Sequence, residues 1–258
     1  MLTKSQEQNV DIFRKLDLFL RSQGIVCAEK QIFKYMDERK RSVAFDISRH
    51  IKGLIYSKLT PQQSWSVVEP KLAQVDKLFF NYDISQIKQK DGDYFASGIF
   101  RLKCGNMSTT RQMSNLRYNI SMLELIDRTE GRIDYFYNSM PATRLVKTLS
   151  AYNGAYKLKY ISSALAWEYL RNVGIDGIKP DVHIRRIMGS NRLGYSKRPE
   201  ATDAEVISIA QEVASQTGLS LSMVDALLWS FCAEGEAKIC VKNPNCHLCP
   251  IIKYCNIR

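Results

Sequence analysis

Apolar residues recur at intervals of three and four along most of the chain, which is the spacing of one face of an α-helix. Runs of alternating β-branched residues, which would predict strands, are few. The opening segment illustrates the helical spacing with Val10, Phe13, Leu16 and Leu20. Gly24 can end this helix, because glycine readily adopts the left-handed conformation of a helix end. The pattern therefore predicts an all-α protein.

The first half of the chain predicts short helices joined by tight loops. Residues 51–58 give an apolar helix face, and Pro61 must then interrupt or begin a helix because it has no amide hydrogen. Further apolar segments of this kind continue to Ile126. Residues 25–45 show no clear periodicity, and we interpret them as a connector or short hairpin.

The second half carries clearer helix signals. Thr202 and Glu205 have the three-residue spacing of a capping box, in which each side chain bonds to the backbone amide of the other residue. Gly218 is placed to end that helix. A last apolar helix over residues 222–232 leads into the C-terminal segment.

Length and charge narrow the class of protein. With 258 residues and 45% apolar content, the chain can bury a core as one large domain or two compact lobes. Lys and Arg outnumber Asp and Glu by 37 to 26, a balance typical of proteins that bind polyanions. No apolar run approaches the roughly twenty residues of a membrane span. We expect a cytoplasmic protein without membrane contact.

Four of the seven cysteines lie in the segment CVKNPNCHLCPIIKYC, as Cys240, Cys246, Cys249 and Cys255. The inner pair has the two-residue separation that aims two thiolates at one metal. Disulfides are not expected, because no leader directs the chain to an oxidising compartment. Zinc and an iron-sulfur cluster both remain open. The other three, Cys27, Cys104 and Cys232, are interpreted as buried thiols without chemistry.

Two further stretches are candidates for chemistry. Residues 149–156, LSAYNGAY, place Gly154 directly ahead of a helix-forming run that starts at Lys157. A glycine turn of this kind is typical of a helix-hairpin-helix, where backbone amides approach a phosphate, and Lys157 would add charge. The alternative is an ordinary helical corner. Asp181 precedes an apolar helix, where aspartate is most often an N-cap.

The order of these features resembles the endonuclease III type of helix-hairpin-helix DNA glycosylase, over roughly residues 45–258. The resemblance implies a two-lobed, all-α HhH-GPD fold, with residues 1–44 as an N-terminal extension. It assigns the hairpin to about 146–172, the aspartate segment to 179–187 and the cluster loop to 240–255.

The family's function implies roles for individual residues. Asp181 would be the essential aspartate that stabilises positive charge on the sugar or orients a water. The stretch LIYSKLTPQQSW looks like the helix and loop whose glutamine enters the duplex, which would give Gln62 or Gln63 the gap-filling role. The resemblance thus implies a monomeric base-excision glycosylase that flips a damaged, mismatched or modified base from double-stranded DNA. The sequence does not identify that base.

The resemblance also implies a cofactor. The four tail cysteines would hold a [4Fe-4S] cluster that pins the C-terminus and presents Lys242, Lys253 and Arg258 to phosphates. The first cysteine gap is five residues where the family's usual gap is six, which keeps a single zinc open.

Family members that also cut the strand use a lysine amine. Counting from the glycine turn leads to Leu158, between Lys157 and Lys159. Counting back about eighteen residues from Asp181 leads instead to residues 162–164, which contain no lysine. The second count favours a monofunctional glycosylase, with Lys159 as the remaining lyase candidate.

Two other functional classes fit parts of the sequence. A non-catalytic, zinc-containing nucleic-acid-binding protein explains the charge and the cysteines. An iron-sulfur electron carrier explains the cysteines alone.

Overall fold

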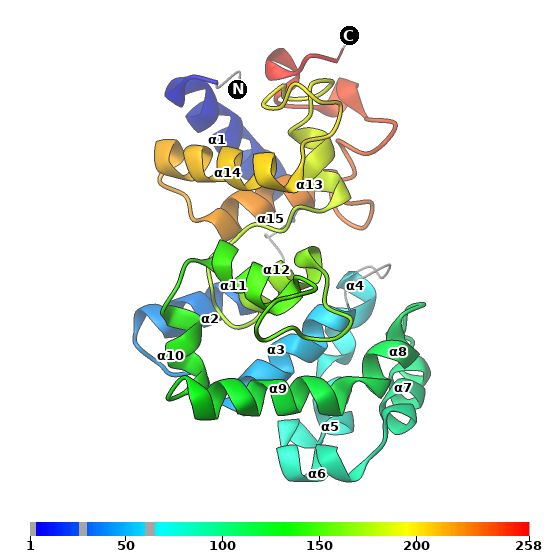
Figure 1. The fold of residues 1–258 in the computed structure, drawn as a ribbon. Helices are drawn as coiled ribbons and strands as arrows, with labels where there is room; N and C mark the ends of the chain where they lie inside the picture. The colour runs from blue at the N-terminus through cyan, green and yellow to red at the C-terminus, as the bar shows by residue number, and fades with distance from the viewer. Residues whose placement is uncertain (1–3, 26–29, 60–64, 258) are drawn as a thin grey trace. The chain divides into compact units, whose positions relative to one another are not determined.

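The computed structural model describes residues 4–25, 30–59 and 65–257. Within these ranges every regular element is a helix, which confirms the all-α prediction (Figure 1). The chain forms two compact units, one made of Met1–Phe33 with Asp176–Arg258 and the other of Lys34–Ile175. None of the helices in the described ranges combines the length and apolar character that a membrane crossing requires.

The discontinuous unit is built from four main helices: α1 (Gln6–Ser22), α13 (Val182–Ile187), α14 (Asp203–Thr217) and α15 (Leu221–Cys232). Helix α1 packs against both α14 and α15, as the blue and orange helices of Figure 1 show. Helix α13 also packs on α15. The tail then folds into turns and two short 3-10 helices, η3 (Cys246–Leu248) and η4 (Ile252–Tyr254).

The helix signals read from the sequence are confirmed in this unit. Thr202 and Glu205 form a complete capping box at the start of α14, and Gly218 ends that helix with φ of 73°. The opening helix ends at Ser22, two residues before Gly24. Its buried apolar face differs from the predicted one at Val10, which is exposed, and the first buried apolar residue is Ile12.

Helix α1 shares its core with the C-terminal segment. Ile12, Leu16 and Leu20 of α1 are fully buried in one cluster with residues of α13, α14 and α15. The division between units therefore falls after Phe33 and after Ile175, whereas the predicted extension ended at residue 44.

The continuous unit is organised around α3 (Ile47–Leu59), which packs against α8, α9 and α12. Its other elements are α2 (Lys30–Lys40, which starts before the unit boundary), α4 (Trp65–Val68), η1 (Glu69–Lys71), α5 (Leu72–Leu78), η2 (Phe80–Tyr82), α6 (Ile84–Gln89), α7 (Gly92–Arg101), α8 (Thr109–Ser114), α9 (Leu116–Thr129), α10 (Ile133–Asn138), α11 (Ala142–Ser150) and α12 (Ser163–Arg171).

The interpretation of residues 25–45 as a connector or hairpin is wrong, because α2 runs through this segment. Ile32 and Met36, one helical turn apart, are its buried apolar residues. Two buried apolar positions are too few to show a helical period in the sequence. The other contacts that hold α2 in place are the polar contacts of Arg39, which are described below.

Candidate active site and cysteine tail

Asp181 is the N-cap of α13. Its Oδ1 accepts hydrogen bonds from the amides of His183 and Ile184, at 2.8 and 3.0 Å. Within the described residues its Oδ2 has no hydrogen-bond partner, and the side chain is half-buried. The cap thus fixes the orientation of the carboxylate while leaving one oxygen available.

The segment before Asp181 is held by α15. Both carboxylate oxygens of Asp176 accept amides at the start of α15, from Leu221 at 3.1 Å and Ser222 at 2.8 Å. The amide of Lys179 donates to the buried Asp225 at 2.8 Å. These bonds set the approach of the chain to α13, so the position of Asp181 is determined by the packed core of its unit.

Arg186 connects the aspartate helix to the cysteine tail. Its Nη2 lies 3.1 Å from Nδ1 of His183 and 3.4 Å from the carbonyl oxygen of Cys240. Since arginine has no acceptor, His183 must accept through Nδ1. Burial lowers the pKa of His183, against the raising effect of Asp181, which agrees with a neutral ring. Asp181 and the first tail cysteine thus belong to one hydrogen-bonded assembly.

The tail cysteines are all free thiols. A hydrogen bond from the Cys232 thiol lowers the pKa of Cys240 to about 7, and the nearby Arg192 and Arg186 act in the same direction. Burial raises the pKa of Cys249 to about 11, with Cys240, Cys255 and Cys246 adding to the effect. The spacing of the cysteines did not indicate that Cys232 lies beside Cys240.

The tail supplies four free thiols, which are the ligand type of a thiolate-bound metal centre. His247, between two of these cysteines, is exposed. In the described ranges, no group of three or more His, Cys, Asp or Glu side chains has the geometry to hold a metal ion.

The basic residues of the tail differ in their surroundings. Lys242 is exposed. The amine of Lys253 lies 3.4 Å from Asp11 and 4.7 Å from the ring centre of Tyr254. Arg258 lies outside the described residues, as do Gln62 and Gln63.

The segment between α11 and α12 differs from the predicted hairpin in where the second helix starts. The expectation of a helix directly after Gly154 is wrong, because α11 ends at Ser150 and α12 starts only at Ser163. Gly154 packs against the end of α11, where an added Cβ would collide with the carbonyl oxygen of Thr148. Close backbone packing therefore accounts for this glycine.

The connection between α11 and α12 is fixed by its own lysines. Lys157 donates from Nζ to the carbonyl oxygens of Ser150 and Ile161, at 2.6 and 2.7 Å. The backbone of Lys159 is bound on both sides by the buried amide of Asn119 in α9. The Lys159 side chain is exposed, with its amine 4.2 Å from the ring centre of Tyr118.

The turn next to α12 lies several residues later than the sequence suggested. Tyr160 has a left-handed backbone with φ of 56°, and Ser162 caps α12 by accepting the amide of Leu165. Residues 162–164, reached by counting back from Asp181, form the N-terminus of this helix. A serine followed by the apolar run ALAWEYL was the available signal for this start.

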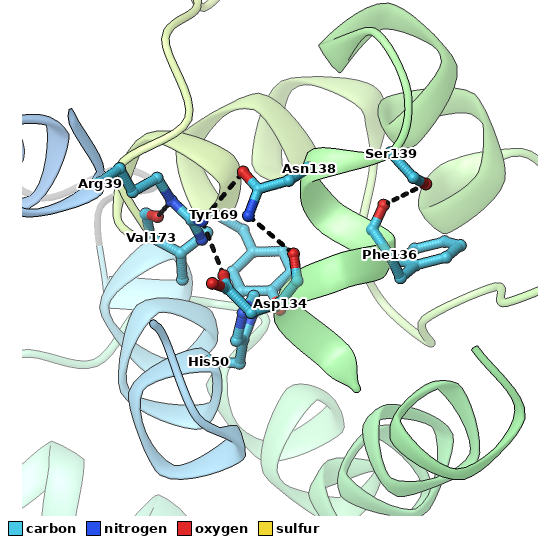
Figure 2. A network of polar contacts seen from close by, with 8 residues as sticks. All are labelled: Arg39, His50, Asp134, Phe136, Asn138, Ser139, Tyr169 and Val173. Atoms are coloured by element: carbon cyan, nitrogen blue, oxygen red, sulfur yellow. Dashed lines mark hydrogen bonds and ion pairs between the residues drawn. The ribbon is translucent and has the colours of Figure 1, made fainter. Parts of the chain in front are cut away.

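A buried polar network joins α12 to its neighbours (Figure 2). Arg39 of α2 pairs with Asp134 of α10 at 2.7 Å and donates to the carbonyl of Val173. The hydroxyl of Tyr169 in α12 lies 2.8 Å from Nδ1 of His50 in α3. Burial lowers the pKa of His50 well below its usual value. The network joins α12 to α2, α3 and α10.

Sequence reasoning missed Lys58. Its side chain is 1% exposed, and its amine makes no hydrogen bond within residues 4–25, 30–59 and 65–257. Burial lowers its pKa to about 7, and Lys157 lowers it further. The signal was present, because Lys58 continues the buried stripe of Ile51, Leu54 and Ile55 at helical spacing.

Comparison with known proteins identifies no relative: no family model, no curated protein and no solved structure matches this chain. The functional argument therefore rests on the residues themselves.

Proposed function

We propose that this protein is a base-excision DNA glycosylase of the helix-hairpin-helix type, which flips a damaged, mismatched or modified base and cleaves its N-glycosidic bond. The observation that carries the proposal is the assembly of Asp181, α13 and the cysteine tail. A half-buried carboxylate with one unpartnered oxygen caps a helix that Arg186 bonds to the backbone of Cys240. This joins the two features that gave the family resemblance.

Asp181 would stabilise the positive charge that builds on the sugar as the bond to the base breaks. A fixed carboxylate is effective in this role because it needs no reorganisation during the reaction. Its Oδ2 could also orient the attacking water as a general base. The net charge of +11 fits binding to a DNA backbone.

The four tail cysteines would hold the [4Fe-4S] cluster that the resemblance implies, with one zinc as the alternative. Either centre would supply structural order, because the tail from Cys240 to Cys255 has only short 3-10 turns of its own. Whether strand cleavage follows base release depends on an amine, and residues 162–164 offer none.

The first test is the metal content of anaerobically purified protein. Iron and acid-labile sulfide at about four each per chain support the proposal. One zinc without sulfide would favour a nucleic-acid-binding protein with a structural metal, and would leave Asp181 as a helix cap.

The second test is a panel of lesion-bearing duplexes, each scored for breaks with and without hot alkali. We expect base release from at least one duplex and its loss in Asp181→Asn, with DNA binding retained. Full activity in Asp181→Asn would contradict the assigned mechanism. His247→Ala, at an exposed site between two cysteines, is the matched control and should leave activity unchanged.

A further inference from the structure

Arg192 connects the two ends of the cysteine tail. It lies in the connection between α13 and α14, and its Nη2 donates to the carbonyl oxygen of Lys242 at 3.3 Å. Its own carbonyl oxygen accepts the amide of Asn256 at 2.7 Å. Lys242 follows Cys240 by two residues, and Asn256 directly follows Cys255. One residue therefore closes the segment that begins with the first of the four tail cysteines and ends with the last.

The backbone around Arg192 is shaped to hold the end of the tail. The side-chain amide of Asn256 donates to the carbonyl oxygen of Ser190 at 2.9 Å. Gly194 has φ of 71°, and a Cβ added there would collide with the side-chain nitrogen of Asn256. The residue next to Cys255 is thus held by backbone contacts that do not depend on the Arg192 side chain.

The guanidinium of Arg192 has one donor left over. Its Nη1 donates to the carbonyl oxygen of Asn191 and its Nη2 to that of Lys242. Its Nε is buried and has no hydrogen-bond partner in the part of the chain that the structure describes. The charge of Arg192 acts on the thiols of both Cys240 and Cys255, and the guanidinium lies within hydrogen-bonding reach of Cys240. An unpaired buried donor beside sulfur ligands is expected where a bound group supplies the acceptor.

The charge of the tail favours the same interpretation. Residues 240–258 include no Asp or Glu. Four thiolates around Zn²⁺, or around a [4Fe-4S] core, give a centre with a net charge of about −2. Removing such a charge from water is costly unless cations compensate it. Arg186 is one cation beside Cys240, and its Nε is also buried without a described partner. Arg192 supplies a second cation, whose charge also reaches Cys255.

We propose that Arg192 is a positioning residue of the metal centre, which closes the cysteine loop and donates a hydrogen bond from Nε to a metal-bound sulfur. The inference rests on the metal centre of the proposed function, and it applies to zinc and to a [4Fe-4S] cluster alike. A donor of this kind strengthens metal binding by orienting the ligand. In an iron-sulfur cluster it also raises the reduction potential, because it stabilises the added negative charge.

Metal release from the purified full-length protein tests the first effect. Arg192→Met removes both the donor and the charge, whereas Arg192→Lys keeps the charge and loses the Nε donor. The backbone bond to Asn256 remains available in both. We expect an excess of chelator to remove the metal at least about 10-fold faster from Arg192→Met than from the wild type, with Arg192→Lys in between. Arg198→Met is the matched control, because Arg198 lies in the same connection with its side chain 68% exposed, and release should be unchanged.

The reduction potential of a bound cluster separates this role from a purely structural one. We expect a more negative potential in Arg192→Met, because the loss of a donor and a cation disfavours the added electron. Circular dichroism identifies a variant that has lost its helices. Arg192→Lys, which keeps the length and charge of the side chain, then carries the comparison with the wild type.

The outcomes distinguish this inference from the proposed function. Equal release from Arg192→Met and the wild type, or an unchanged cluster potential, would overturn the role of Arg192 and leave the metal centre in place. A wild type that holds neither zinc nor iron would remove the metal centre and this inference with it, whereas Asp181→Asn would still test the glycosylase. Faster release from Arg192→Met in a protein that releases no base would support the role of Arg192 and contradict the glycosylase.

Discussion

Replacing Lys58 with methionine should stabilise the protein, because the lysine is held in a site that disfavours its charge. Methionine has a similar length and no charge, and it fits irregular apolar spaces. In the unfolded chain Lys58 titrates near 10.5, whereas burial lowers the pKa to about 7 in the folded protein. Between these two values the unfolded state binds a proton that the folded state does not, and stability therefore falls as the pH falls.

The magnitude follows from the two pKa values. Each pKa unit corresponds to about 1.4 kcal/mol, so at pH 7 the lysine costs at most roughly 5 kcal/mol of folding free energy. The cost disappears as the pH approaches 10.5 and stays constant below pH 7. We expect the gain in Lys58→Met to be several kcal/mol at pH 7 and to shrink steadily between pH 7 and 10.

Urea denaturation of the wild type and Lys58→Met at pH 6, 7.5 and 9 measures this difference. Lys157 is the charged neighbour that also acts on the amine, so Lys157→Met should recover only a small part of the gain. A Lys58→Met variant that is less stable than the wild type, or whose gain does not change with pH, would refute the reasoning. It would show that the amine keeps its charge in the folded protein.

Substitutions at three other positions, Asp181, Tyr169 and His50, test the site and its support. Asp181→Asn should leave stability within about 0.5 kcal/mol, because asparagine caps helices as well as aspartate, while Asp181→Ala should cost about 1 kcal/mol in urea denaturation. Base release should fall at least about 100-fold in both variants, and equal activity in Asn and wild type would limit Asp181 to capping. Tyr169→Phe removes the hydroxyl that bonds His50 and Tyr137 and should cost about 1–3 kcal/mol, against no measurable change for the fully exposed Tyr152→Phe. Because burial lowers the pKa of His50, stability should also fall below pH 6.5 by up to about 1.4 kcal/mol per pH unit, and His50→Asn should flatten that dependence.

The sequence predicted the helices that carry their own local signals. The capping box at Thr202 and the left-handed Gly218 depend on neighbours within a few residues, so they can be recognised without the fold. Helix α2 could not be recognised in this way. Its attachment depends on contacts of Arg39 with Asp134 and Val173, which lie 95 and 134 residues further along the chain.

The candidate site shows the same division. Asp181 is the cap that its position before an apolar helix predicted. The turn before α12 was assigned to Gly154 because glycine lets the backbone approach a phosphate closely, whereas the left-handed residue before α12 is Tyr160. The side-chain amide of Asn119 in α9 bonds the backbone of Lys159, the residue before Tyr160. Turn propensities describe only neighbouring residues, so they could not predict this contact.

Two basic side chains of helix α3, His50 and Lys58, are fully buried. They differ in their hydrogen-bond partners. His50 shares a hydrogen bond with Tyr169 and is neutral in that environment, so it contributes to the packing of α12. Among the residues that the structure describes, none offers such a bond to the Lys58 amine, and we expect methionine at this position to give a lower free energy of folding. A buried charged residue without a hydrogen-bond or ion-pair partner is typical of functional sites. At such sites a protein is less stable than a variant with an apolar residue in the same position would be. A gain in stability in Lys58→Met would therefore show that this amine lowers the stability of the fold.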